Sequence, residues 1–71
     1  MKLIEINGTA YNKERIIGVG SPAKDEEENR WYFLVYIDDS IEEFVIGESV
    51  EDVMNQRTEL ILQLTQENVN D

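Results

Sequence analysis

Hydrophobic residues along the chain follow two different periods, and the change of period falls at Gly47. Before this glycine, apolar residues form short runs rich in β-branched and aromatic side chains and separated by turn-forming residues, as is typical of strands. After it, apolar residues recur three and four positions apart, as on one face of an α-helix. The pattern predicts strands over about residues 2–7, 14–20, 31–38 and 41–46, and a helix over about 50–66.

We expect an α+β fold in which four short antiparallel strands form one sheet and the C-terminal helix packs on one face of it. The strongest strand is WYFLVYI, residues 31–37, and turn-forming residues separate it from IEEFVI, residues 41–46. The helix should bury an apolar stripe formed by Val50, Val53, Met54, Leu60, Ile61 and Leu64.

The N-terminal strand should end in a tight turn. Asn7 and Gly8 are the dipeptide best suited to a two-residue hairpin turn, because both central residues of that turn have positive φ. Such a turn would place Ile6 opposite Thr9. The segment TAYNKE, residues 9–14, is compatible either with the returning hairpin strand or with a loop.

Two further segments carry local signals. Residues 21–30 combine Pro22 with a run of charged side chains, which predicts an acidic, mobile loop. This loop lacks the spacing and the glycine of an EF-hand, so we expect it to hold no structural ion. Ser49 stands where a helix N-cap is expected, and Asp52 resembles the reciprocal partner of a capping box.

Two stretches of the sequence resemble a known family. EINGTAY, residues 5–11, and EFVIGESVEDVM, residues 43–54, are similar to the pattern of FlbD/SwrD-type small bacterial proteins and of similar short phage proteins. The resemblance covers residues 3–11 and 33–56, and it implies strands followed by a C-terminal helix, with motifs that are structural rather than catalytic. The chain departs from the pattern in its longer, more acidic segment over residues 21–30.

Length and composition indicate a single small domain. At 71 residues with 41% hydrophobic side chains, the chain can fold around one core, although a domain of this size buries only roughly 60% of the surface of its unfolded form. We expect one domain over residues 1–71, with a frayed C-terminus over about 67–71.

The residue types present exclude several chemistries. Cys and His are both absent, so the chain has no disulfide, no thiol or imidazole nucleophile and no thiolate or imidazole metal ligand. Glu42 and Glu43 are neighbours in a strand and therefore point to opposite faces, so they cannot form a catalytic pair. We expect no enzymatic activity, cofactor, metal site or small-molecule substrate. The N-terminus lacks the apolar stretch of a signal peptide and no segment has the roughly 20 apolar residues of a membrane span, so we expect a cytoplasmic protein.

The net charge of −10 is concentrated in one part of the sequence. Residues 25–52 hold 11 acidic side chains and one basic side chain, Arg30, whereas charges balance in the remainder. We expect no direct binding to nucleic acid or to a membrane, because phosphate contacts require Lys and Arg. The acidic segment would either favour a basic partner or serve only to keep the protein in solution.

One face of the predicted sheet is a candidate partner-binding surface. We expect Val35 to pair with Phe44 and Phe33 with Ile46, which would place these apolar residues under the helix. The opposite face would then be apolar as well, although a solvated sheet face normally carries polar residues. Its predicted centre is formed by Tyr32, Leu34 and Tyr36. The predicted site for a second copy or another protein also includes Glu43 and Val45.

Two alternatives remain open from the sequence. In the first, TAYNKE or the end of the chain folds back over this face and makes it part of the core. In the second, the carboxylates imitate the phosphates of nucleic acid, and the protein inhibits a basic protein that handles DNA or RNA.

Overall fold

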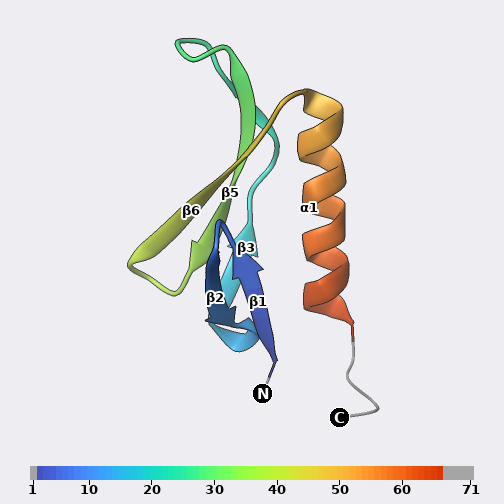
Figure 1. The fold of residues 1–71 in the computed structure, drawn as a ribbon. Coiled ribbons are helices and arrows are strands. Elements are labelled where there is room, and N and C mark those ends of the chain that lie inside the picture. The colour runs from blue at the N-terminus through green and yellow to red at the C-terminus, as the bar shows by residue number, and fades with distance from the viewer. Residues whose placement is uncertain (1, 67–71) are drawn as a thin grey trace.

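The computed structural model describes residues 2–66 and has the expected α+β fold, with antiparallel strands followed by a C-terminal helix (Figure 1). The predicted frayed end, residues 67–71, lies outside the described residues. The elements are β1 (Leu3–Ile6), β2 (Thr9–Asn12), the 3-10 helix η1 (Lys13–Arg15), β3 (Ile16–Val19), β4 (Ala23–Asp25), β5 (Arg30–Ile37), β6 (Ile41–Gly47) and α1 (Val50–Thr65).

The strands are divided between two sheets, where the sequence predicted one. β1 and β2 pair as a separate hairpin, and β3 to β6 form a four-stranded sheet with β5 in its interior. β6 pairs along one side of β5, while β3 and β4 follow one another along its other side. Between them, Gly20 donates its backbone N–H to the carbonyl of Leu34 at 2.7 Å, so residues 16–25 act as one interrupted edge strand.

The prediction of a loop over residues 21–30 is partly wrong, because Ala23–Asp25 form β4 against the start of β5. A tight turn follows, in which Asp25 accepts the backbone N–H of Glu27 and of the residue after it. An edge strand tolerates charged side chains, and Pro22 directly precedes the strand, where a missing N–H costs no ladder bond. A proline followed by charged residues is therefore compatible with a short edge strand as well as with a loop.

The Asn-Gly turn is confirmed. Asn7 and Gly8 have φ values of 52° and 85°, and Ile6 pairs with Thr9 as expected. The segment TAYN is therefore the returning strand of the hairpin, and η1 (Lys13–Arg15) leads the chain into β3.

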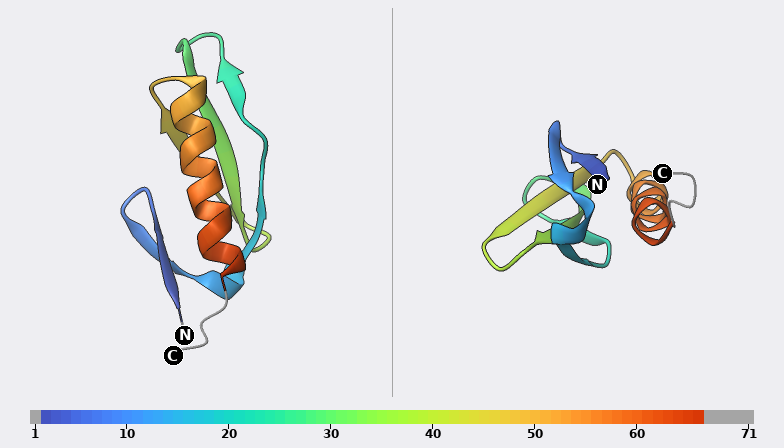
Figure 2. Two further views of the ribbon diagram at one scale, coloured as in Figure 1. Left: turned by 90° about the vertical axis from the view of Figure 1, so that its right-hand side faces the viewer. Right: turned by 90° about the horizontal axis from the view of Figure 1, so that it is seen from below.

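The hairpin and α1 both pack on the same face of the four-stranded sheet (Figure 2). This inner face is formed by alternate residues of β5, which are almost completely excluded from solvent. The core consists of Phe33, Val35 and Ile37 from β5, Ile4 and Ile6 from the hairpin, and Val53 and Leu60 from the helix.

The predicted helix stripe is correct for Val53 and Leu60 but wrong for Val50 and Met54, which are 40% and 54% exposed. Arg57 lies on the buried side of the helix between Val53 and Leu60, and its Nε donates to the carbonyl of Gly20 at 2.7 Å. This bond satisfies a carbonyl in the interruption between β3 and β4. The arginine therefore belongs to the packing of the helix on the sheet.

The register between β5 and β6 differs from the prediction by one residue. Val35 was expected opposite Phe44, but it lies opposite Glu43, and Leu34 lies opposite Phe44. Since side chains alternate along a strand, a slip of one residue exchanges the two faces of β6. Val45 consequently lies on the inner face, where it packs against the core.

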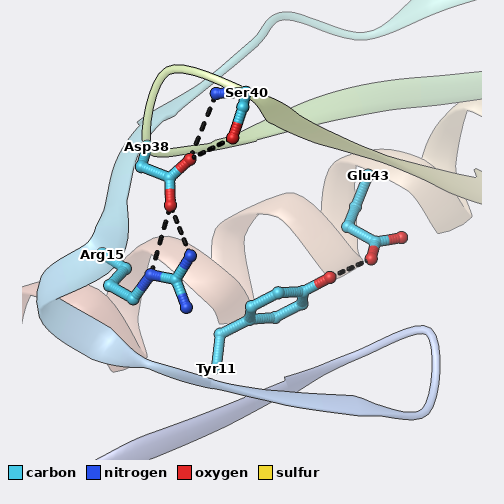
Figure 3. A network of polar contacts seen from close by, with 5 residues as sticks. All are labelled: Tyr11, Arg15, Asp38, Ser40 and Glu43. Atoms are coloured by element: carbon cyan, nitrogen blue, oxygen red, sulfur yellow. Dashed lines mark hydrogen bonds and ion pairs between the residues drawn. The ribbon is translucent and has the colours of Figure 1, made fainter.

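The length of the turn between β5 and β6 explains this difference. Ile37 pairs with Ile41, so three residues connect the strands, whereas the predicted register requires a two-residue turn. The turn begins at Asp38, which has a φ of 46°, a conformation that Asp tolerates better than most residues. Its Oδ1 accepts the backbone N–H and the hydroxyl of Ser40 at 3.1 and 3.0 Å (Figure 3). Arg15 pairs with the other carboxylate oxygen, and Asp38 donates its N–H to the Arg15 carbonyl at 2.9 Å.

The passage from β6 into α1 is tightly packed. Ser49 is the N-cap, and its Oγ accepts the N–H of Asp52 at 3.1 Å. The Asp52 carboxylate in turn accepts the N–H of Glu48 at 3.0 Å, one residue earlier than in the usual capping box. Gly47 is buried, and a Cβ at this position would lie 2.5 Å from Cγ2 of Val53.

We predict that Gly47→Ala lowers the free energy of unfolding by about 1–3 kcal/mol, because the added methyl group overlaps Val53 and forces the helix away from β6. Gly18→Ala is the matched control, since its Cβ would come no closer than 3.4 Å to Tyr36, and it should change stability by less than about 0.5 kcal/mol. Urea denaturation of the three proteins measures both values. An equal loss of unfolding free energy in the two variants would contradict the close packing at Gly47.

Candidate partner-binding face

The outer face of the four-stranded sheet, turned away from α1 and the hairpin, is apolar at its centre. Side chains that are paired across an antiparallel ladder point to the same face, so the register assigns this face directly. β5 contributes Tyr32, Leu34 and Tyr36, and β6 contributes Phe44 and Ile46. We call these five residues the outer apolar face.

On this side, the interrupted edge strand next to β5 places small residues beside the two tyrosines. Gly18 pairs with Tyr36, and Ala23 pairs with Tyr32. A Cβ on Gly18 would be 3.4 Å from Cδ2 of Tyr36, so the ring of this tyrosine lies close to the glycine backbone.

The outer apolar face is accessible to solvent. Phe44 is 53% exposed and Ile46 is 47% exposed, and Tyr36 is also exposed. The rings of Tyr32 and Phe44 are in contact, with centroids 5.5 Å apart and planes tilted by 43°. Within residues 2–66, α1 and the hairpin pack on the inner face instead, and TAYNKE does not fold back over the outer one.

Two of the five predicted binding residues lie on the wrong face for this role. Glu43 and Val45 point to the inner face because of the register described above, while Tyr32, Leu34 and Tyr36 are placed on the outer face as expected. Phe44 and Ile46, instead of Glu43 and Val45, are the β6 residues on the outer face. The outer face is consequently more apolar than the sequence indicated.

Glu43 connects β6 to the hairpin. Its carboxylate accepts a hydrogen bond from the Tyr11 hydroxyl through one oxygen (Figure 3). The other oxygen accepts from the Asn7 side-chain amide at 3.2 Å. The hydrogen bond from Tyr11 is the main reason why the pKa of Glu43 lies below its usual value. The same bond raises the pKa of Tyr11, because the phenol must keep its proton to donate.

The free edge of β6 is also occupied by side chains. Asn7 donates its amide N–H to the backbone carbonyl of Phe44 at 2.7 Å, and Gln56 of α1 donates to the carbonyl of Ile46 at 3.4 Å. Backbone groups on an exposed edge otherwise invite pairing with another strand. Because side chains already occupy these carbonyls, the face of the sheet is a better candidate than the edge of β6 for binding a partner.

Charged side chains lie at both ends of the outer apolar face. Glu42 pairs with Tyr36 and lies on this side at one end. At the other end, Asp25 pairs with Arg30, and the acidic turn follows. An open depression of about 470 Å³ lies there, lined by Lys24, Asp25, Glu26, Arg30, Tyr32, Phe44 and Ile46.

Among residues 2–66, no group of three or more carboxylates is arranged to hold a metal ion. The helix in this part of the chain is neither long enough nor apolar enough to cross a membrane. In comparisons with protein-family models, with curated proteins and with solved structures, nothing matches the chain. The resemblance to FlbD/SwrD-type proteins therefore stays a prediction.

Sequence reasoning missed Phe44 and Ile46, although the glycine at position 47 could have identified their face. IEEFVIG contains apolar residues at both alternations, so periodicity alone does not assign its faces. Glycine at position 47 was informative, because it is the residue that a helix crossing close to the inner face requires. Counting back from Gly47 by twos places Val45 and Glu43 on the inner face.

The bond between Tyr11 and Glu43 makes stability depend on pH in a specific way. A carboxyl with a lowered pKa stabilises the fold fully above its usual value of 4.5, and this contribution is lost as the pH falls through the lower, folded value. A phenol with a raised pKa stabilises the fold fully below its usual value of 10.0, and this contribution is lost as the pH rises through the higher, folded value.

We therefore predict that Tyr11→Phe lowers the urea midpoint at neutral pH and weakens its dependence on pH at both extremes. Some loss of stability in acid should remain in the variant, because the hydrogen bond from Arg15 also lowers the pKa of Asp38. Tyr36→Phe is the control, since Tyr36 is on the outer face. Identical pH profiles for wild type and Tyr11→Phe would show that the bond to Glu43 contributes nothing in solution.

Proposed function

We propose that this chain is a small, non-catalytic protein-interaction module that binds another protein, or a second copy of itself, through the outer apolar face. The observation that carries the proposal is the exposure of Tyr36, Phe44 and Ile46 side by side on a sheet face that no other described element covers. Antiparallel sheets with one face in solvent normally place polar residues there. This face instead has an apolar centre and charged ends.

The residue types support the same proposal. Aromatic side chains are enriched in protein interfaces, since they bury a large area at little cost in side-chain entropy, and tyrosine keeps a hydroxyl for a partner or for water. Three of the five residues of the outer apolar face are aromatic. Contiguous exposed apolar patches on small proteins often mark interaction sites.

The alternative of a nucleic-acid mimic receives less support. A mimic needs carboxylates that are free to face a basic groove, but several acidic residues are engaged within this chain. Asp38 pairs with Arg15, Glu43 accepts from Tyr11, and Asp52 accepts a backbone N–H from the residue before the helix cap. Their positions are explained by turns, by a cap and by the docking of the hairpin. The cytoplasmic location expected from the sequence stays a prediction.

Photo-cross-linking in the cells that make the protein tests the proposal without knowledge of the partner. Benzoylphenylalanine replaces Phe44 in one variant and Leu62, which is 57% exposed on α1, in the control. We expect a discrete cross-linked product from position 44 and none from position 62. The mass of that product distinguishes a second copy from another protein.

Equal or absent cross-linking at the two positions would contradict a binding role for the outer face. Salt-sensitive binding to basic nucleic-acid enzymes that survives Phe44→Ser would support the mimic instead, because mimicry does not depend on this face.

A further inference from the structure

We propose that the partner of the outer apolar face is a basic amphipathic helix of another protein, and not a second copy of this chain. This inference rests on the proposed function and adds the chemistry of the ligand to it. Its two components, the positive charge and the helical shape, follow from different features of the face.

The positive charge follows from the residues at the ends of the face. Glu42 lies at the Tyr36 end, next to a turn that contains Asp38 and Asp39. Asp25 lies at the Tyr32 end, next to the turn that contains Glu26, Glu27 and Glu28. Three basic residues lie near these ends: Arg15 pairs with Asp38, Arg30 lies 3.8 Å from Glu28, and Lys24 lines the depression at the Tyr32 end. Acids outnumber them at both ends. A ligand that covers the apolar centre therefore meets net negative charge at both of its ends.

This charge distribution argues against a second copy. Two copies stacked face to face would bring an acidic end of one against an acidic end of the other in either orientation, because both ends carry an excess of acids. Like charges placed across an interface oppose association and select against the wrong partner. A partner with Lys or Arg at both ends of an apolar stripe converts the same repulsion into attraction.

The helical shape follows from the dimensions of the face and from its edges. β5 has eight residues and so spans about 27 Å, the length of a helix of about 18 residues. The chain already uses a helix of 16 residues, α1, to cover the inner face of the same strands, so a helix on the outer face would complete a three-layer arrangement. Addition of a strand to β6 is less favourable, since side chains occupy the carbonyls of Phe44 and Ile46 on its edge.

Three synthetic peptides of 18 residues test the proposal by fluorescence anisotropy. The first has Leu on one helical face and Lys on the other, the second replaces every Lys by Glu, and the third has the composition of the first in a scrambled, non-amphipathic order. We expect the Leu/Lys peptide to bind at least about tenfold more tightly than either of the others, with an affinity that falls as salt is added.

Variants of the protein localise this binding. Phe44→Ser and Ile46→Ser should each lower the affinity for the Leu/Lys peptide about tenfold. Leu62→Ser, at a similarly exposed position on α1, should leave this affinity unchanged. A variant with Glu26, Glu27, Glu28 and Glu42 changed to Gln should bind several-fold more weakly and show less dependence on salt. Circular dichroism confirms that each variant retains the fold.

The outcomes separate this inference from the function on which it rests. A doubled solution mass that Phe44→Ser returns to the monomer would identify a second copy as the occupant, as would failure of all three peptides together with self-cross-linking at position 44. Equal binding of the Leu/Lys and Leu/Glu peptides would refute the basic partner. In each case the proposed interaction face stands. Binding of the Leu/Lys peptide that is indifferent to Phe44→Ser and Ile46→Ser would refute both.

Discussion

The three-residue turn that begins at Asp38 determines which side chains of β6 face the core, and most of the structure depends on it. Asp38 adopts a positive φ, accepts two hydrogen bonds from Ser40 and pairs with Arg15, which joins the turn to the start of β3. The turn length fixes the register between β5 and β6, and a shift of one residue would exchange the inner and outer faces of β6. Phe44 and Ile46 are exposed because of this turn.

The inner face is adapted to the same register. Glu43 is the acidic residue that the register turns inward, and Tyr11 and Asn7 of the hairpin both donate to its carboxylate. The hairpin thereby docks on β6 through a polar contact at the border of an apolar core. Gly47 lies on the same inner face of β6, four residues after Glu43. Only a residue without a side chain at this position allows α1 to approach. Register, hairpin docking and helix packing are thus mutually consistent, as expected of a sequence that specifies one fold.

Much of the fold could be predicted from the sequence because the features that indicate it involve residues close together in the chain. The change of period at Gly47, the Asn-Gly turn and the cap at Ser49 each depend on residues close together in the chain, and all three are found in the structure. The face assignment of β6 could not be predicted in this way, because IEEFVIG is apolar in both alternations and the register depends on a turn length. The short strand β4 was missed for a related reason: charged residues are as acceptable on a sheet edge as in a loop. The predicted face was therefore correct for the three β5 residues of the candidate site and wrong for its two β6 residues.

Nuclear Overhauser contacts between β5 and β6 report the register of these two strands in solution. The structure predicts backbone contacts that link Leu34 with Phe44 and Phe33 with Val45, together with contacts between the rings of Tyr32 and Phe44. Contacts that link Val35 with Phe44 would instead indicate a two-residue turn. That result would place Phe44 in the core and contradict the outer apolar face.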